Sequence, residues 1–213
     1  MEVHNTNVNY IQYGRGKDIV LLHGWGQNIE MMQFLGDPLS NSYRITILDF
    51  PGFGESEEPQ EVWNITDYAN MLHELLTKLK IENPTLIGHS FGGRVAIRYA
   101  AQYPVEKLVL FGSPCVITKK KQPLKVKALK AAKKLPGMKK IAEIAKNYIG
   151  SRDYKAASPM MRNILVQVVN EDLSDYAKKI TAPTLLIWGD QDTEAPVEEA
   201  KLLEKLLKDG ALI

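Results

Sequence analysis

The chain has 213 residues, of which 45% are hydrophobic and 24% are charged, and its net charge at pH 7 is +2. This length supports one substantial hydrophobic core, and the composition is that of an ordinary globular protein. The nearly balanced charge gives no reason to expect a nucleic-acid partner. The single cysteine, Cys115, excludes an internal disulfide and a cysteine-rich zinc site. No stretch approaches the ~18 apolar residues of a membrane span, and the polar N-terminus lacks a signal-peptide core, so we expect a cytoplasmic protein.

Five short apolar runs follow one another along the chain, and each is expected to form a buried β-strand. They are residues 18–22, 44–48, 85–87, 107–111 and 183–188. Continuous apolar runs of this length are typical of parallel strands that are covered by helices on both faces. Before them, residues 1–13 alternate loosely around Asn5-Thr6-Asn7, which predicts an antiparallel hairpin.

Segments with apolar residues at helical spacing separate these runs, at 66–80, 90–103 and 197–207. Either Thr66 or Asn64 can cap the first of them. The alternation predicts an α/β fold with an open, mostly parallel twisted sheet and helices on both faces. In such sheets, ligands bind beyond the carboxyl ends of the strands. Because Gly, His, Ser, Asp and Trp residues follow the apolar runs at those ends, we expect a functional site there.

A long insertion interrupts the alternation, so the predicted organisation is a core of residues 1–113 and 182–213 with a helical insertion at 114–181. Amphipathic patterns at 124–135 and 138–148 predict helices within it. Residues 116–150 contain 11 lysines and one acidic residue, Glu143. The simplest interpretation, which we favour, is a solvated helical face. The alternative is a basic surface that attracts a membrane of anionic lipid or an acidic substrate.

The segment Gly88-His89-Ser90-Phe91-Gly92 matches the G-x-S-x-G pattern of a nucleophile elbow. A predicted strand leads into the motif and a predicted helix leaves it, so Ser90 stands at the apex of a sharp turn that exposes its hydroxyl. The glycines on either side leave room for the strained serine backbone, and the helix N-terminus favours developing negative charge. Ser90 is therefore the candidate nucleophile.

Four motifs in this order resemble those of the α/β-hydrolase superfamily, in particular its esterase-like branch that carries a lid. They are His23-Gly24-Trp25-Gly26, Asp49-Phe50-Pro51-Gly52-Phe53-Gly54-Glu55-Ser56, Gly88-His89-Ser90-Phe91-Gly92-Gly93 and Trp188-Gly189-Asp190-Gln191-Asp192. The resemblance covers essentially the whole chain, and it is specific for fold and reaction type but not for substrate. It implies that the insertion is a lid, which shapes the substrate pocket.

The resemblance also implies roles for residues around the elbow. The backbone N–H groups of Trp25 and Phe91 are expected to form the oxyanion hole. Asp49 and Ser56 are expected to brace their loop and are given no chemical role. The residues expected to support the oxyanion turn and the elbow are His23, Gly24, Gly88, His89 and Gly92.

The resemblance places the catalytic acid at Asp192, with Asp190 as the competing choice. A carboxylate there would orient a histidine, which in this fold follows the acid along the chain. The four histidines, however, all precede Ser90: they are His4, His23, His73 and His89. His89 adjoins the nucleophile, but adjacent elbow residues point in different directions, so it is not expected to reach Asp192, and His23 is the only remaining candidate near the site.

We therefore expect that the catalytic histidine is missing from this chain, together with the last strand and helix of the fold. Residues 210–213 suggest a helix stop and the opening of another strand. Because the last strand of the fold is expected to be missing, the edge of the strand at 183–188 is expected to be unpaired. The chain is then either a fragment of a complete hydrolase or a natural short form.

The sequence thus predicts a serine hydrolase of small ester-type substrates that forms an acyl-enzyme on Ser90 and is impaired because the base is absent. This chemistry requires no metal and no organic cofactor. Acyl transfer and C–C bond hydrolysis use the same groups and stay open. The alternative from a different class is a non-catalytic ligand-binding module, which keeps the pocket but has a degenerate triad.

Overall fold

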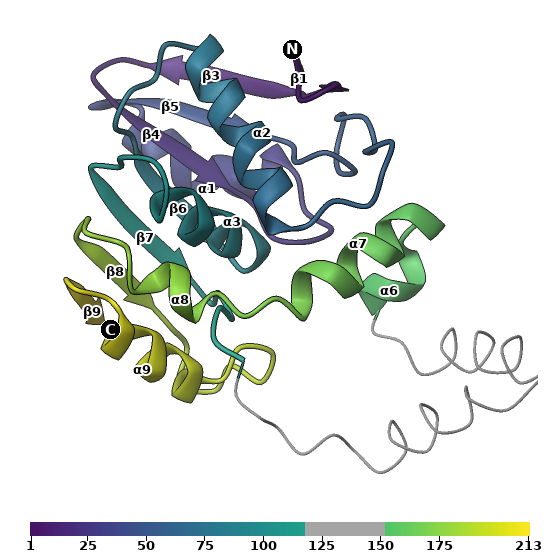
Figure 1. The fold of residues 1–213 in the computed structure, drawn as a ribbon. Coiled ribbons are helices and arrows are strands. Elements are labelled where there is room, and N and C mark those ends of the chain that lie inside the picture. Colours follow the sequence, from purple (N-terminus) through teal and green to yellow (C-terminus); the bar gives the residue numbers. More distant parts are fainter. Residues whose placement is uncertain (118–151) are drawn as a thin grey trace, which may run out of the picture.

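A computed structural model of the chain describes residues 1–117 and 152–213. Its centre is a sheet of seven strands in the order β3-β5-β4-β6-β7-β8-β9 (Figure 1). The strands are β3 (Tyr10–Gly14), β4 (Lys17–Leu22), β5 (Tyr43–Leu48), β6 (Thr85–His89), β7 (Lys107–Phe111), β8 (Thr184–Ile187) and β9 (Gly210–Leu212). Only β3 pairs antiparallel with its neighbour within this sheet; the described neighbours are otherwise parallel. The predicted open, mostly parallel sheet is confirmed.

The five predicted apolar runs form β4 to β8, with ends that agree within two residues. The prediction of an unpaired edge at 183–188 is wrong. β9 pairs parallel with β8 from Thr184↔Gly210 to Leu186↔Leu212, and the Trp188 N–H donates to the Ile213 carbonyl at 3.0 Å. The strand opening predicted at 210–213 is confirmed as β9, and its three residues already pair with β8 and cover its edge.

A separate two-stranded hairpin precedes the sheet, formed by β1 (Glu2–Val3) and β2 (Thr6–Asn7). His4 and Asn5 connect them, with φ angles of 50° and 55°, the conformation that tight two-residue hairpin turns require. The hairpin is shorter than the predicted range 1–13, because the chain from Tyr10 onward leaves it and pairs with β5 instead.

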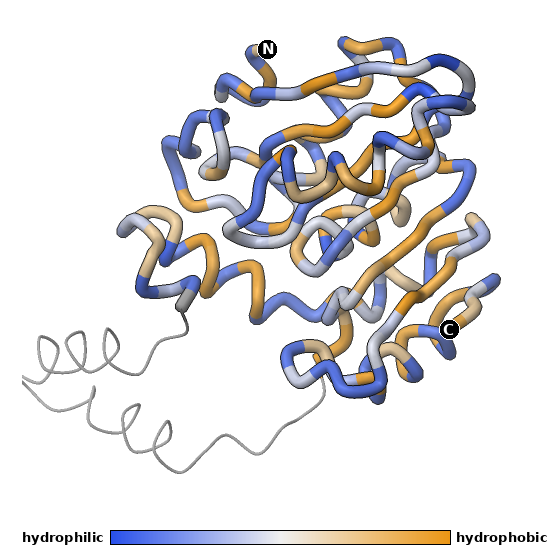
Figure 2. Tube along the Cα trace, turned by 180° about the vertical axis from the view of Figure 1, so that it is seen from behind, coloured by the Kyte–Doolittle hydropathy of each residue, from blue (hydrophilic) through white to orange (hydrophobic). Residues whose placement is uncertain are grey.

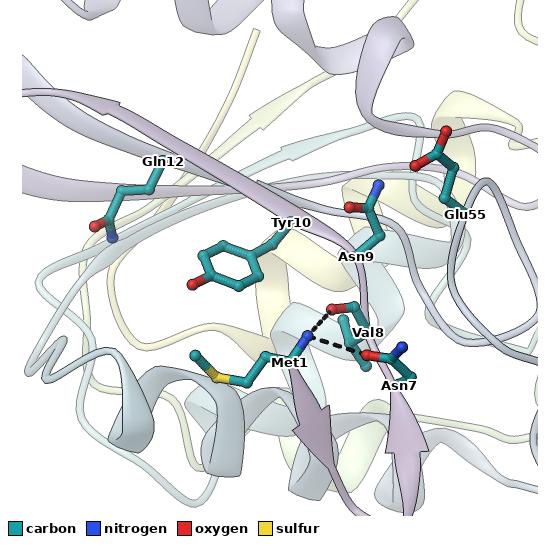
Figure 3. Close-up of a pocket in the computed structure, with 7 residues that line it drawn as sticks. All are labelled: Met1, Asn7, Val8, Asn9, Tyr10, Gln12 and Glu55. Atoms are coloured by element: carbon teal, nitrogen blue, oxygen red, sulfur yellow. Dashed lines mark hydrogen bonds between the residues drawn. The ribbon is translucent and has the colours of Figure 1, made fainter.

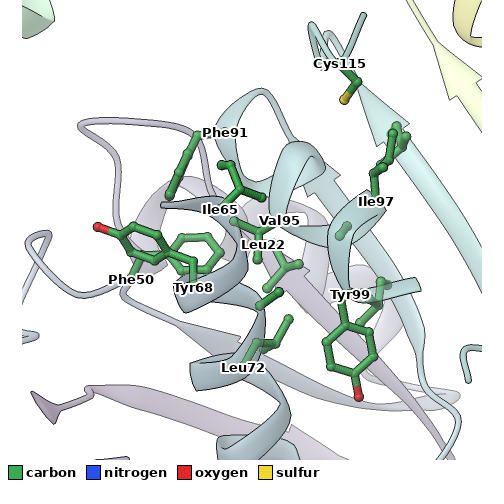
Figure 4. Close-up of a cluster of buried hydrophobic side chains, with 14 of the residues drawn as sticks. Leu22, Phe50, Ile65, Tyr68, Leu72, Phe91, Val95, Ile97, Tyr99 and Cys115 are labelled. Carbon is green, nitrogen blue, oxygen red and sulfur yellow. The ribbon is translucent and has the colours of Figure 1, made fainter. Parts of the chain in front are cut away.

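Helices cover both faces of the sheet. α2 (Ile65–Lys78), α3 (Phe91–Ala100), α8 (Ser174–Ala177) and α9 (Val197–Leu206) lie on one face, and α1 (Ile29–Leu39) lies on the other (Figure 1). Strand residues alternate between the two: Leu22 joins the larger cluster, shown in Figure 4, and Leu21 joins the smaller cluster under α1. Hydrophobic residues accordingly follow the central strands in Figure 2.

The sequence predicted the start of α2 well, but it missed α1. Asn64 caps α2 by accepting the Thr66 and Asp67 N–H groups, and Asp67 returns the bond by accepting the Asn64 N–H at 2.8 Å. In α1, only three residues are buried, and Pro38 in its last turn is a residue that usually ends a helix pattern. This narrow apolar stripe gives a weak periodic signal.

Between β7 and β8 the chain leaves the sheet and returns through α6 (Arg152–Ala156), α7 (Pro159–Val169) and α8. The guanidinium of buried Arg94 donates to the carbonyls of Pro114 and Glu171 and so links the start of this excursion to the residues that follow α7. The helices predicted at 124–135 and 138–148, and the lysine-rich run, lie outside the described residues. Within residues 1–117 and 152–213, no helix combines the length and apolarity needed to cross a bilayer.

Candidate active site

Ser90 stands alone between the end of β6 and the first residue of α3. Its backbone has φ 50° and ψ −110°, a strained conformation for a residue other than glycine. The turn needs glycine beside it, because a Cβ on Gly92 would lie 2.2 Å from the Leu22 carbonyl oxygen. The Ser90 N–H donates to the Phe111 carbonyl at 2.9 Å. Ser90 therefore has the position and the backbone strain that the elbow motif predicts.

His23 is fully buried at the end of β4, and both of its ring nitrogens are engaged. Nε2 accepts the Phe50 N–H at 2.9 Å, so the proton must reside on Nδ1, which donates to the Gly24 carbonyl at 2.7 Å. Burial lowers the pKa of His23 to about 4, although the Gly24 carbonyl and the charge of Asp49 act in the opposite direction. A neutral ring with no free lone pair cannot accept the proton of Ser90.

The backbone N–H groups of Trp25 and Phe91 are the expected oxyanion donors. The N–H groups of Trp25 and Phe91 donate to no other residue in the described part of the chain, and the rings of these residues are 5.4 Å apart, centroid to centroid. The Gly24 carbonyl, which shares a peptide unit with the Trp25 N–H, accepts from His23 Nδ1 and from the Gln27 N–H. Because C=O and N–H of a trans peptide unit point in opposite directions, the Trp25 N–H is aimed away from these donors.

The second N–H group is fixed in the same way. The Ser90 carbonyl shares a peptide unit with the Phe91 N–H, and it accepts the N–H groups of Gly93 and Arg94 at 3.1 and 3.2 Å. The Phe91 N–H therefore points out of the N-terminus of α3, where the helix dipole adds positive potential. Such a pair of preorganised donors can stabilise an oxyanion.

Asp192 lies in the loop after β8, on the other side of the elbow. One carboxylate oxygen, Oδ1, accepts the N–H groups of Glu194 and Ala195, both at 2.9 Å. The other, Oδ2, would lie 3.2 Å from a Cβ on Gly112, the residue after β7. Asp190 is exposed and Asp192 is half-buried, so of the two candidate aspartates it is Asp192 whose carboxylate approaches the end of β7.

Of the remaining histidines, His4 and His73 pack against aromatic rings outside the site, and His89 lies beside Gln27. His4 packs edge-on against Trp63, with 5.1 Å between the ring centroids, and His73 stacks on Tyr103 at 3.7 Å. Within the described residues, neither forms a hydrogen bond or ring contact with three segments of the site: the elbow at 88–92, the predicted oxyanion turn at 23–27, and the loop after β8 at 189–195, called the acid loop. His89 contacts the Gln27 side chain, with 3.1 Å between Nδ1 and Oε1.

The loop after β5 is braced as predicted. The Asp49 carboxylate is buried and accepts from the Ile29 N–H at 2.7 Å, and from Asn9 Nδ2 and the Glu55 N–H, both at 2.9 Å. The Ser56 hydroxyl donates to the Asp49 carbonyl at 2.6 Å. Asp49 thus ties the start of α1 to the loop.

Phe53 and Gln27 lie at the site, although no role was predicted for them from the sequence. Phe53 is presented by the braced loop and packs edge-on against Trp25, with 4.8 Å between the ring centroids. Phe53 lies within the motif of residues 49–56, and Gln27 directly follows the motif of residues 23–26. Met161 of α7 packs over Gly52, since a Cβ there would lie 2.3 Å from its Sδ, which brings the insertion against this loop.

A pocket of about 670 Å³ lies elsewhere on the molecule, between the hairpin and β3 (Figure 3). The Met1 ammonium donates there to Asn7 Oδ1 and to the Val8 carbonyl. None of its lining residues belongs to the elbow, the oxyanion turn or the acid loop. Within residues 1–117 and 152–213, no group of three His, Cys, Asp or Glu side chains is arranged to hold a metal ion.

Comparison with known proteins shows the family to which the chain belongs. The family described as alpha/beta hydrolase fold matches residues 18–142, more than half of the chain, and the chain belongs to this family. It is similar to the AB hydrolase superfamily protein YisY of Bacillus subtilis, with 28% identity over 94% of this chain and 83% of that protein.

Solved structures with similar folds include a bacterial membrane phospholipase A, with 26% identity and a TM-score of 0.79 over 100% of this chain and 76% of that one. An esterase from Exiguobacterium antarcticum, EaEST, has 28% identity and a TM-score of 0.75 over 98% of this chain and 86% of that one.

Proposed function

We propose that the chain is a serine hydrolase of small ester-type substrates, with Ser90 as nucleophile and the Trp25 and Phe91 N–H groups as oxyanion hole. The observation that carries the proposal is the strained Ser90 backbone at a strand-to-helix turn, next to two backbone N–H groups for which the described residues provide no acceptor. The names of two similar proteins, an esterase and a phospholipase A, support an ester as the substrate class.

In the proposed reaction, Ser90 Oγ attacks the ester carbonyl carbon, and the carbonyl oxygen becomes an oxyanion held by the two N–H groups. The C–O bond to the alcohol then breaks, and the alcohol leaves with a proton. Water hydrolyses the resulting acyl-enzyme and restores the serine. Phe53 and Trp25 form an aromatic wall beside the site, and the contact of α7 with Gly52 places the insertion where it can border the substrate.

The proton of Ser90 must pass to a base, and we propose that this base is absent from the 213 residues. His23 has no free lone pair, and His4 and His73 pack elsewhere. His89 precedes Ser90 at the end of β6, where side chains of adjacent residues point in different directions, and its Nδ1 contacts Gln27 Oε1, so we do not assign it as the base. Asp192 is assigned the role of orienting the missing histidine through its Oδ2. Enzymes that lack one triad member retain roughly 10³- to 10⁴-fold catalysis over water from the oxyanion hole and binding, so we expect weak activity.

The test is cleavage of p-nitrophenyl acetate by the chain and by Ser90→Ala, with and without added imidazole as a substitute base. We expect a slow rate that depends on Ser90 and rises with imidazole, after subtraction of the rate measured with Ser90→Ala. Equal rates for the two proteins at every imidazole concentration would overturn the proposal. A high Ser90-dependent rate that is insensitive to imidazole would retain the hydrolase but refute the missing base, and His89→Ala would then be examined.

The second candidate is a non-catalytic ligand-binding module, and the engagement of both nitrogens of His23 favours it. Equal rates in the esterase test, together with saturable binding of phenyl acetate by calorimetry, would support this function. Acyl transfer belongs to the same chemistry and is distinguished by adding an alcohol, which would appear in the ester product if it accepts the acyl group.

A further inference from the structure

Gln27 joins the oxyanion turn to the elbow through a single oxygen atom. Its Oε1 accepts the Gly24 N–H at 3.0 Å and lies 3.1 Å from Nδ1 of His89. Its own backbone N–H donates to the Gly24 carbonyl at 3.2 Å. Gln27 therefore contacts both polar groups of Gly24 and the side chain of the residue that precedes Ser90.

The hydrogen-bond chemistry of this cluster defines which atoms carry protons. A backbone N–H can only donate, so the Gly24 N–H fixes which end of the Gln27 carboxamide faces the turn. Because that end is an acceptor, His89 must carry a proton on Nδ1, and Nε2 of the neutral ring is left unprotonated. Burial lowers the pKa of His89, and the charge of Asp192 opposes this shift.

The side chains of Gln27 and His89 pack closely against Gly24. A Cβ on Gly24 would lie 2.7 Å from His89 Nδ1 and 3.0 Å from Gln27 Oε1. The imidazole therefore lies directly against the backbone of the turn. Gln27 and His89 are both half-buried, where hydrogen bonds are stronger than in water.

The contact between Gln27 and His89 lies beyond the carboxyl ends of β4 and β6. β4 and β6 are paired from Ile19↔Thr85 to Leu22↔Gly88, and the two N–H groups of the oxyanion hole come from the residues just beyond that last pair. The elbow is also held on its other side, where His89 pairs with Phe111 of β7. On the side of β4, the contact between Gln27 and His89 spans the gap where strand pairing has ended.

We propose that Gln27 is a positioning residue of the hydrolase: its carboxamide holds the oxyanion turn and the elbow at a fixed separation, so that the Trp25 and Phe91 N–H groups converge on one oxygen atom. This inference rests on the proposed function, but the placement of the two N–H groups can be measured without any catalysis. Gln27 does not contact the reacting atoms and acts through Gly24 and His89.

The first experiment uses nitrogen NMR on the full chain and three variants. Gln27→Met removes the acceptor at similar length, Gln27→Glu keeps an acceptor oxygen, and Gln12→Met is the control, since Gln12 is exposed on β3 and donates to Thr46 Oγ1. We expect the parent, Gln27→Glu and Gln12→Met to show His89 protonated on Nδ1 at neutral pH. In Gln27→Met we expect loss of that single form, and displaced amide signals of Trp25 and Phe91. Unchanged His89, Trp25 and Phe91 signals in Gln27→Met would overturn the proposal.

The second experiment measures the Ser90-dependent cleavage of p-nitrophenyl acetate in the imidazole-supplemented assay. We expect Gln27→Met to lower kcat by about 10- to 100-fold and to leave KM within about 2-fold, because misplaced oxyanion donors weaken the transition state more than substrate binding. Gln12→Met is expected to match the parent. An unchanged kcat, or a loss confined to KM, would count against the positioning role. If the parent itself shows no Ser90-dependent rate, the proposed function has failed, and the NMR result alone decides whether Gln27 places the two N–H groups.

Discussion

The two sides of the candidate site are built in different ways. On the nucleophile side, residues 23–27 and 88–92, backbone and side chains from several strands and loops hold one another, and His23 is completely buried. On the acid side, residues 189–195, Asp192 is held by N–H groups of its own loop, and Gly189 and Asp190 are exposed. The comparison indicates that the geometry around Ser90 is fixed by long-range contacts, whereas the carboxylate of Asp192, the candidate acid, is placed by a local turn.

The largest expected difference between the two sides comes from adding one methyl group to a glycine. A Cβ on Gly92 would lie 2.2 Å from the Leu22 carbonyl oxygen and 2.5 Å from its carbon, whereas a Cβ on Gly189 would meet nothing within 4 Å. Because backbone cannot move aside cheaply, we expect Gly92→Ala to lower the free energy of unfolding by about 3 kcal/mol. Gly189→Ala should leave it unchanged or raise it by about 0.5 kcal/mol.

Urea denaturation of the parent and both variants measures these two changes in the free energy of unfolding. Similar losses in the two variants would show that the acid loop is as tightly constrained as the elbow, and the comparison would fail. Loss of stability in neither variant would mean that α3 can shift away from β4 without cost.

A second expected effect concerns pH and tests the buried tautomer of His23. Its pKa is lowered from 6.5 to about 4, so between these values the unfolded chain binds a proton that the folded chain does not. Stability is therefore expected to fall as the pH drops from about 6.5 towards 4, and to show no further contribution from His23 below that. From pH 7 to pH 5 the contribution is about 2 kcal/mol.

The measurement is the free energy of unfolding at pH 7 and pH 5 for the parent, His23→Gln and the control His73→Gln. We expect His23→Gln to be less stable at pH 7, since the Phe50 N–H and the Gly24 carbonyl lose their partner. It should also lose less stability on acidification than either of the others. The same loss in all three proteins would assign the pH dependence to other groups.

Features that depend on a few adjacent residues could be predicted from the sequence. The apolar runs predicted β4 to β8 because buried parallel strands need continuous apolar residues. The elbow could be predicted because Gly88, Ser90 and Gly92 meet a local backbone requirement. The cap of α2 was also within reach, since Asn64 and Asp67 are three residues apart.

Features that depend on contacts between distant residues could not be predicted in this way. The role of Gln27 requires the position of His89, 62 residues further along the chain, and no pattern in either segment encodes their meeting. The pairing of β9 with β8 was missed for a similar reason: residues 210–213 were expected to open a strand, but three residues do not indicate which strand they pair with. α1 was missed because its buried stripe is narrow and contains a proline.

The smallest expected effect is on the acid side, and it separates the two aspartates there. Asp192→Ala removes the acceptor for the Glu194 and Ala195 N–H groups, and since Ala195 is buried, we expect a loss of about 1 kcal/mol. Asp192→Asn keeps an acceptor oxygen at the same place, and exposed Asp190→Ala removes no described contact, so both should remain within about 0.5 kcal/mol of the parent. Thermal unfolding of the three variants checks this order. A loss of stability in Asp192→Asn equal to that in Asp192→Ala would show that the negative charge, and not the hydrogen bonds of the turn, holds the loop. The acid side would then depend on charge interactions with the rest of the site, just as the nucleophile side depends on its long-range contacts.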